Sequence, residues 1–221
     1  MPPAPAEQAQ VSPESYLAGE RASQAKHELW RGEVFAMAGA SYAHNRIVAN
    51  LVAALRDALQ GGPCRALPSD MKVHLPSREA FVYPDASIVC GPPAFYDATQ
   101  DVLTNPAAVF EVLSESTESY DRGKKFEWYR TVPSITDVLL VSQDRPLVEQ
   151  YTRQGDGTWV LHELRAGDTL VLFSDGISHR SPLEALRHLE PDALCEELIS
   201  RHRKPSDDAT VVACDLKGMT P

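Results

Sequence analysis

The feature that most constrains the fold is an apolar run near the middle of the chain, Ala107 to Leu113, which contains a single carboxylate, Glu111. A short run that is apolar at successive positions predicts a buried strand. A carboxylate inside such a strand is costly unless it is paired with a cation or bound to a metal. The rest of the chain is therefore expected to bring a partner to Glu111.

The pattern around this strand predicts a mixed α/β (α+β) fold. Residues 42–60 form the clearest predicted helix, because apolar residues recur at three- and four-residue steps: Ile47, Leu51, Ala54, Leu55 and Ala58. Shorter helices are predicted after Ser12-Pro13, at 120–131 and at 191–203. Strands are predicted at 27–38 (a hairpin turning at Gly32), 65–75, 81–90, 136–142, 147–152, 158–164, 169–173 and 209–215.

Composition and charge limit the possible functions. The chain has 221 residues, of which 43% are hydrophobic and 24% charged, as in a globular protein of one domain or one domain plus a fragment. Its net charge of −10 argues against broad nonspecific coating of DNA, although an acidic metal site is compatible with it. No segment has the features of a signal peptide, and no apolar stretch approaches the roughly 20 residues that span a bilayer. We therefore expect a cytoplasmic protein with no membrane partner.

The cysteines give no sign of a metal site. None lies in a CxxC pair, and no His/Cys spacing suits zinc. We expect reduced thiols, as in cytosolic proteins, that are small buried or incidental residues. These four cysteines are Cys64, Cys90, Cys195 and Cys214.

Three segments carry candidate catalytic groups. Pro84-Asp85 opens an apolar strand, Glu111 lies within the next one, and Lys125 follows on a predicted helix. Two carboxylates on adjacent strand ends can hold a hard cation such as Mg²⁺ (or Mn²⁺), which activates water and stabilises charge on a phosphodiester. A nearby lysine can orient the nucleophile or offset charge in the transition state. These groups together predict metal-dependent phosphodiester hydrolysis.

The order of these segments resembles the PD-(D/E)XK nucleases, and within them the Uma-type "putative restriction endonuclease" family of bacteria, over roughly residues 14–163. The segments that carry the resemblance are His27-Glu28-Leu29 with Gly32-Glu33, Met37-Ala38 with Ser41 and His44-Asn45, Tyr83-Pro84-Asp85, Glu111-Val112-Leu113-Ser114 with Ser116-Thr117, and Asp121, Lys125 and Tyr129.

This resemblance implies a fold and an activity. The expected fold is a restriction-endonuclease-like central mixed sheet flanked by helices, and the expected activity is Mg²⁺-dependent cleavage of DNA. Asp85 and Glu111 take the positions of metal ligands, and Lys125 that of the basic residue, because the position two after Glu111 is Leu113 rather than lysine. Glu28, His44 and Lys124 are auxiliary candidates. A homodimer is a further possibility.

Several simpler interpretations compete with this site. Asp85 alone could be a turn or cap residue after Pro84, and Glu111 could form a structural ion pair with Arg122 or Lys125. His44 could be a residue of the helix start or the core. The whole module could also be an inert interaction domain that keeps the nuclease fold.

The choice between Lys124 and Lys125 depends on the phase of the helix. Asp121, Lys125 and Tyr129 are spaced by four and share one face, whereas Lys124 lies about 100° away around the axis. If the face with Tyr129 points toward the sheet, Lys125 reaches Glu111 and stays charged beside the carboxylates. Lys124 is then directed to solvent or to a phosphate.

The C-terminal segment resembles a different family. Ser174-Asp175-Gly176 and Asp207-Asp208 are similar to the last part of PPM-type Ser/Thr phosphatases, where Asp175 and Asp207 would take metal-binding positions. The upstream ligands of that family are absent, so no phosphatase activity is expected, although a phosphatase-like regulatory role is a further alternative. The expected organisation is therefore a disordered tail at 1–13, a nuclease-like domain at 14–164 and a short α+β phosphatase-like appendage at 165–221.

Overall fold

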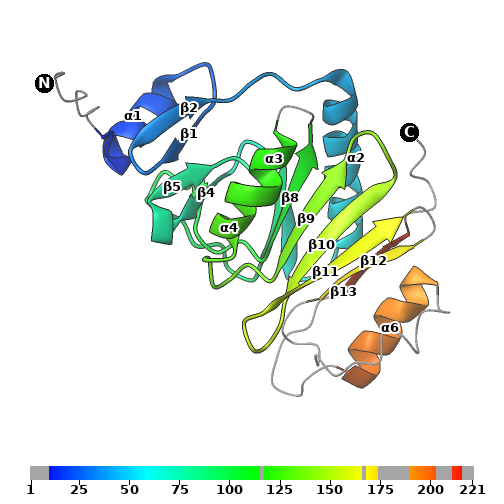
Figure 1. The fold of residues 1–221 in the computed structure, drawn as a ribbon. Coiled ribbons are helices and arrows are strands. Elements are labelled where there is room, and N and C mark those ends of the chain that lie inside the picture. The colour runs from blue at the N-terminus through cyan, green and yellow to red at the C-terminus, as the bar shows by residue number, and fades with distance from the viewer. Residues whose placement is uncertain (1–9, 115–116, 166–167, 174–189, 203–210, 216–221) are drawn as a thin grey trace, which may run out of the picture.

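The structure is a computed structural model that describes residues 10–114, 117–165, 168–173, 190–202 and 211–215. The described chain contains a six-stranded sheet, a five-stranded sheet and a two-stranded sheet, with helices packed around the first (Figure 1). This arrangement is mixed α+β, as the sequence pattern predicted.

The six-stranded sheet has the order β11-β10-β9-β8-β6-β3. β8 and β9 are parallel, and the other neighbours are antiparallel, so the sheet is mixed. The apolar run with Glu111 is the inner strand β8, which is buried along its whole length. The strands are β3 (Cys64–Pro68), β6 (Ala86–Cys90), β8 (Ala108–Leu113), β9 (Asp137–Ser142), β10 (Leu147–Arg153) and β11 (Trp159–Arg165).

Helices cover both faces of this sheet (Figure 1). Helix α2 (Tyr42–Ala58) packs on one face, and its Leu55 shares a core cluster with Phe110 of β8. The other face is covered by α3 (Glu118–Tyr120), a π-helical turn (Asp121–Lys125) and α4 (Phe126–Tyr129). Successive strand residues point to opposite faces, so Glu111 points away from α2 and toward the π-helical turn.

The five-stranded sheet has the order β2-β1-β5-β4-β7 and was not expected as a separate layer. The predicted hairpin at 27–38 is confirmed as its first two strands. The helix α1 (Pro13–Ala22) begins after Ser12, whose side chain accepts a hydrogen bond from the Ser15 N–H. The strands are β1 (His27–Trp30), β2 (Glu33–Ala36), β4 (Lys72–Leu75), β5 (Ala80–Val82) and β7 (Val102–Leu103), with a 3₁₀ turn at Pro76–Arg78.

The segment predicted as one strand at 81–90 is two strands in different sheets. β5 belongs to the five-stranded sheet and β6 to the six-stranded sheet, and residues 83–85 cross between them. Pro84 has no N–H to donate to a sheet, so a crossover at this residue loses no ladder hydrogen bond there. The same correction applies to residues 65–75, which are divided between β3 and β4. The two sheets therefore meet beside Asp85.

The described part of the C-terminal segment comprises β12 (Thr169–Phe173), α6 (Pro191–His202) and β13 (Val211–Asp215), and the two strands pair antiparallel. Leu170 is buried in the same core cluster as Leu55 and Phe110, so β12 packs against α2 and the six-stranded sheet. Asp175 and Asp207, the positions similar to phosphatase metal ligands, lie outside the described residues.

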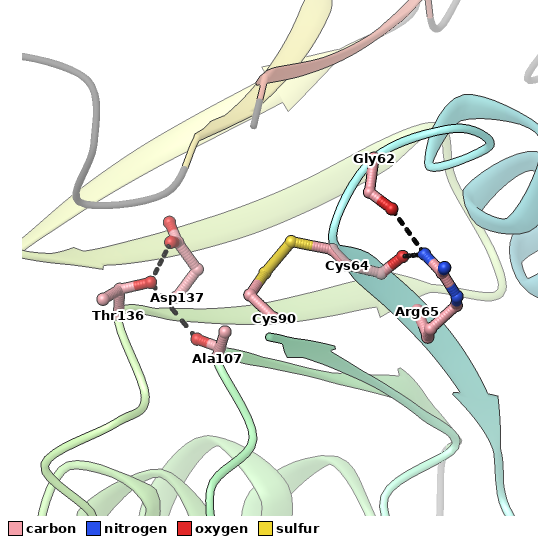
Figure 2. Close-up of a disulfide and its surroundings, with 7 residues drawn as sticks. All are labelled: Gly62, Cys64, Arg65, Cys90, Ala107, Thr136 and Asp137. Carbon is pink, nitrogen blue, oxygen red and sulfur yellow. Dashed lines mark hydrogen bonds between the residues drawn. A yellow bond between two sulfur atoms is a disulfide. The ribbon is translucent and has the colours of Figure 1, made fainter. Parts of the chain in front are cut away.

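The expectation that all cysteines are thiols is wrong for one pair. Cys64 and Cys90 form a disulfide between β3 and β6 (Figure 2). The two cysteines are directly opposite each other in the antiparallel register, which brings their Cα atoms to 3.9 Å. This pairing depends on the strand register and could not be read from a sequence separation of 26. Within the described residues, no helix is both long and apolar enough to cross a membrane.

Candidate active site

Glu111 lies in the middle of β8 and is 3% exposed. Its Oε1 atom accepts a hydrogen bond from the Lys125 ammonium at 3.2 Å and another from the Tyr129 hydroxyl at 2.5 Å. Both donors come from the helical segment over the sheet, as the four-residue spacing predicted. The other carboxylate oxygen, Oε2, takes no part in these two contacts.

Asp85 lies directly before β6 on the neighbouring strand. The register pairs Ala86 with Phe110, which places Asp85 beside Glu111 at the same end of the sheet. Its Oδ2 atom accepts a hydrogen bond from the Val112 backbone N–H at 2.7 Å. Asp85 therefore contacts the strand that carries Glu111. A role as a turn or cap residue after Pro84 does not explain this contact.

His44 approaches Asp85 from the first turn of α2. Its Nε2 atom lies 3.3 Å from Asp85 Oδ2, while Ser41 caps the helix by accepting the His44 backbone N–H. Hydrogen bonding to Asp85 raises the pKa of His44 and burial opposes this, with a net increase above the usual value. His44 is thus at the helix start and beside the site at once.

Glu28 reaches the site from the five-stranded sheet. Its Oε1 atom accepts the Tyr83 backbone N–H at 3.0 Å and lies 3.1 Å from the Lys125 ammonium. Its Oε2 atom is 3.5 Å from the Tyr120 hydroxyl, which donates to it. Glu28 therefore connects β1 both to the crossover that precedes Asp85 and to the lysine.

Lys125 is the centre of this cluster. Its ammonium lies 3.1 Å from Glu28, 3.2 Å from Glu111 and 3.8 Å from Asp121, and its side chain is only 6% exposed. Burial lowers the pKa of Lys125, but the carboxylates of Glu111, Glu28 and Asp121 raise it by more, so it stays charged. Lys124 is exposed, and its ammonium lies 5.5 Å from the centre of the Trp30 ring.

The cluster holds more carboxylates than cations. Burial raises the pKa of Glu111 well above its usual value; the Lys125 ammonium opposes the increase, and Asp121 and Asp85 add to it. Burial likewise raises the pKa of Asp121. A proton or a second cation at this place would relieve the repulsion among these groups.

The donor set is compatible with a hard cation. No group of three or more His, Cys, Asp or Glu side chains suited to a metal occurs among the residues that the structure describes. Mg²⁺, however, commonly uses one or two carboxylates and completes its shell with water and substrate phosphate. Asp85 and Glu111 meet this need, because the hydrogen bonds described above use one oxygen of each carboxylate.

These contacts show which basic residue pairs with Glu111. Arg122 does not pair with Glu111; it pairs with Glu118 and with Glu149 of β10. Glu111 does form an ion pair with Lys125, and this pair lies within the cluster proposed as the site.

Sequence reasoning brought Asp85, Glu111, Lys125, Glu28 and His44 together correctly in space, and it directed Lys124 away from them. It did not include Asp121 in the site, although its spacing of four from Lys125 was the available signal. It also missed three groups that no sequence pattern marks: the Tyr83 N–H, the Val112 N–H and the Tyr120 hydroxyl.

Comparison with known proteins identifies the family of the chain. Residues 13–181 match the Uma2 family, described as "Putative restriction endonuclease". The chain belongs to this family. Two proteins of Synechocystis (strain PCC 6803) are similar along most of their length. The protein slr1290 is 39% identical over 168 residues, covering 76% of this chain and 87% of its own, and sll1609 is 36% identical over 159 residues, covering 72% and 90%.

The fold of this Uma2 family member also occurs in a solved structure. A protein of Anabaena variabilis, titled a putative nuclease belonging to DUF820, superposes with a TM-score of 0.58 at 14% sequence identity. The match covers 83% of this chain and 97% of that one. The mixed sheet with its flanking helices is therefore a nuclease-like fold, as the resemblance implied.

Proposed function

We propose that this protein is a Mg²⁺-dependent (or Mn²⁺-dependent) endonuclease that hydrolyses phosphodiester bonds in DNA. Family membership and the nuclease-like fold support the class of reaction. The observation that carries the proposal is the convergence of Lys125 and Tyr129 on Glu111, beside Asp85 at the same end of the sheet. A buried, charged and oriented cluster of this kind is costly for folding and is typical of functional sites.

Each residue has a distinct role in this proposal. Asp85 and Glu111 hold the divalent cation. The Val112 N–H and His44 Nε2 fix the orientation of Asp85, and the Tyr129 hydroxyl fixes that of Glu111. Hydrogen bonds of this kind orient metal-binding carboxylates and tune their basicity.

A bound cation would lower the pKa of water and stabilise the negative charge that develops on the phosphodiester. Lys125 supplies a fixed positive charge next to Glu111, because Glu28 and Asp121 hold the ammonium in place. Its N–H groups can donate to a non-bridging phosphate oxygen or orient the attacking water. Since the ammonium is preorganised by buried carboxylates, little reorganisation is needed when charge develops on the phosphate.

The test is a cleavage assay on supercoiled plasmid and on single-stranded DNA with Mg²⁺, Mn²⁺ or EDTA. Asp85→Asn, Glu111→Gln and Lys125→Met should each lower the rate by a factor of about 100 or more, the scale of losing one electrostatic stabiliser. Glu118→Gln is the matched control, because it removes an exposed carboxylate from the same helical segment and should leave the rate unchanged. Cleavage that persists in EDTA, or in either carboxylate variant, would refute the assignment.

The same assay addresses the alternative of an inert nuclease-fold module. If the wild-type protein cleaves none of the nucleic acids with either Mg²⁺ or Mn²⁺, that alternative is favoured. An RNA substrate run in parallel distinguishes a deoxyribonuclease from a ribonuclease.

A further inference from the structure

Two basic residues flank one aromatic ring next to the candidate site. Trp30 ends β1, Arg31 follows it in the hairpin turn, and Lys124 lies in the π-helical turn. The Arg31 guanidinium is 5.2 Å and the Lys124 ammonium 5.5 Å from the centre of the Trp30 ring. We call these three residues the Trp30 surface.

The charges of this surface are not neutralised within the described part of the chain. Neither Arg31 nor Lys124 forms an ion pair there, although the adjacent Arg122 and Lys125 of the π-helical turn are both paired with carboxylates. Both side chains are exposed. The chain has a net charge of −10, so two exposed and unneutralised cations beside an acidic cluster form a local positive patch on an otherwise negative protein.

A stack of aromatic rings fixes this surface relative to the site. Trp30 stacks on Trp128 with ring centres 5.2 Å apart, and Tyr120 packs edge-on against Trp128 at 5.6 Å. The Tyr120 hydroxyl donates to Glu28, which contacts Lys125. The Trp30 surface and the cluster around Glu111 are therefore held by one continuous set of packed side chains.

We propose that the Trp30 surface binds the phosphate backbone of the nucleic-acid strand on one side of the bond that is cleaved. This inference rests on the proposed function and names the residues that hold the substrate outside the reacting centre. Because both cations lie on the same ring, they are no more than about 11 Å apart, which corresponds to about three phosphates along one strand.

The contacts of Trp30 favour backbone binding over stacking of a nucleobase. Trp128 covers the Trp30 ring at stacking distance, and two cations are held near it, so the ring serves to position positive charge. Contacts of this type are independent of sequence and strongly dependent on salt. The surface should therefore set affinity and the position of the strand, leaving base preference to other groups.

The test is the binding of fluorescein-labelled single-stranded and duplex DNA, measured by anisotropy between 50 and 300 mM salt, in EDTA and again with Ca²⁺. The variant is Arg31→Gln/Lys124→Gln, and the charge-conserving comparison is Arg31→Lys/Lys124→Arg. The matched control is Arg56→Gln, which also removes an exposed positive charge. Arg56 lies on α2 about 18 Å along the helix axis from His44 at the candidate site. Salt therefore screens the interaction of its charge with groups at the site.

We expect the double Gln variant to reduce the slope of log affinity against log salt by about 1.4 to 1.8, and to weaken binding about 25- to 60-fold at 0.1 M salt. The charge-conserving variant and Arg56→Gln should keep the wild-type slope. In cleavage, the double Gln variant should raise KM by a similar factor and leave kcat nearly unchanged.

Four outcomes separate this inference from the proposed function. Cleavage by the wild type together with an unchanged salt slope in the double Gln variant would overturn the Trp30 surface alone. Binding with the expected slope change but without cleavage would support the surface and count against the endonuclease. No binding of either DNA by the wild type would overturn both. An equal effect per charge removed in the double Gln variant and in Arg56→Gln would show a general charge effect and refute a defined contact.

Discussion

The buried ammonium of Lys125 gives the sharpest test of how the cluster is held together. The ammonium contacts three carboxylates and the side chain is 6% exposed, so its removal leaves those groups buried without their shared cation. Breaking a buried ion pair by removal of one partner costs about 3–5 kcal/mol. Lys125→Met keeps a similar volume and should lower the free energy of unfolding by this amount near neutral pH.

The adjacent Lys124 provides the control. It is exposed and pairs with no carboxylate among the described residues, so Lys124→Met should change the free energy of unfolding by less than about 0.5 kcal/mol. A second control combines Lys125→Met with Glu111→Gln. Because this double variant removes one of the uncompensated carboxylates, it should recover about 1–3 kcal/mol relative to the sum of the single effects.

The measurement is urea unfolding followed by circular dichroism, without metal, at pH 5 and pH 8. With a slope of about 2 kcal/mol per molar urea, the midpoint of Lys125→Met should fall by about 2 M. Burial raises the pKa of Glu111 and Asp121, and loss of the ammonium raises it further. Stability from such groups is present at low pH and is lost as pH rises, so the deficit should be larger at pH 8. Equal midpoints for Lys125→Met and Lys124→Met would refute the reasoning.

Two further predictions concern stability away from the site. The disulfide between Cys64 and Cys90 spans 26 positions, so its reduction should lower the free energy of unfolding by about 3.5 kcal/mol. Dithiothreitol should therefore shift the urea midpoint of the wild type but not that of Cys64→Ser/Cys90→Ser. Identical wild-type midpoints with and without reductant would contradict this. Burial between the rings of Phe81 and Tyr96 lowers the pKa of His74 below its usual value, so His74 stabilises the fold fully above pH 6.5 and progressively less as the pH falls below it. His74→Phe should therefore lose stability less steeply than the wild type between pH 7 and pH 5, and parallel curves for the two proteins would count against this assignment.

The local elements could be predicted because their patterns are strong. The helix α2 has a regular apolar face, and the hairpin β10–β11 turns at the predicted Gly155-Asp156-Gly157. The strand β8 is apolar on both faces, which predicted its burial, and Glu111 within it predicted a partner. The four-residue spacing of Lys125 and Tyr129 then identified that partner, since both donate to Glu111 in the structure.

The tertiary arrangement could not be predicted from the same patterns. Residues 81–90 have one continuous apolar pattern, yet they are divided between two sheets at Pro84. The π-helical turn at Asp121–Lys125 has no sequence signal of its own and was predicted as an ordinary helix. The contact between Cys64 and Cys90 depends on strand register, and the contact between Glu28 and Lys125 depends on how the two sheets pack. Each of these is a long-range relation that local periodicity does not contain.

The position of Glu28 has a consequence for the order of events during synthesis. Glu28 leaves the ribosome early, but its partner Lys125 follows only after all strands of the five-stranded sheet and three strands of the six-stranded sheet have been made. The contacts that complete the site join residues far apart in the chain, such as Tyr83 with Glu28 at a separation of 55 and Val112 with Asp85 at 27. Contacts of this range close late in folding, because loop closure must precede them. The nascent chain therefore contains Asp85 and Glu111 before it contains Lys125. The cluster is complete only when the helical segment with Lys125 packs over the sheet.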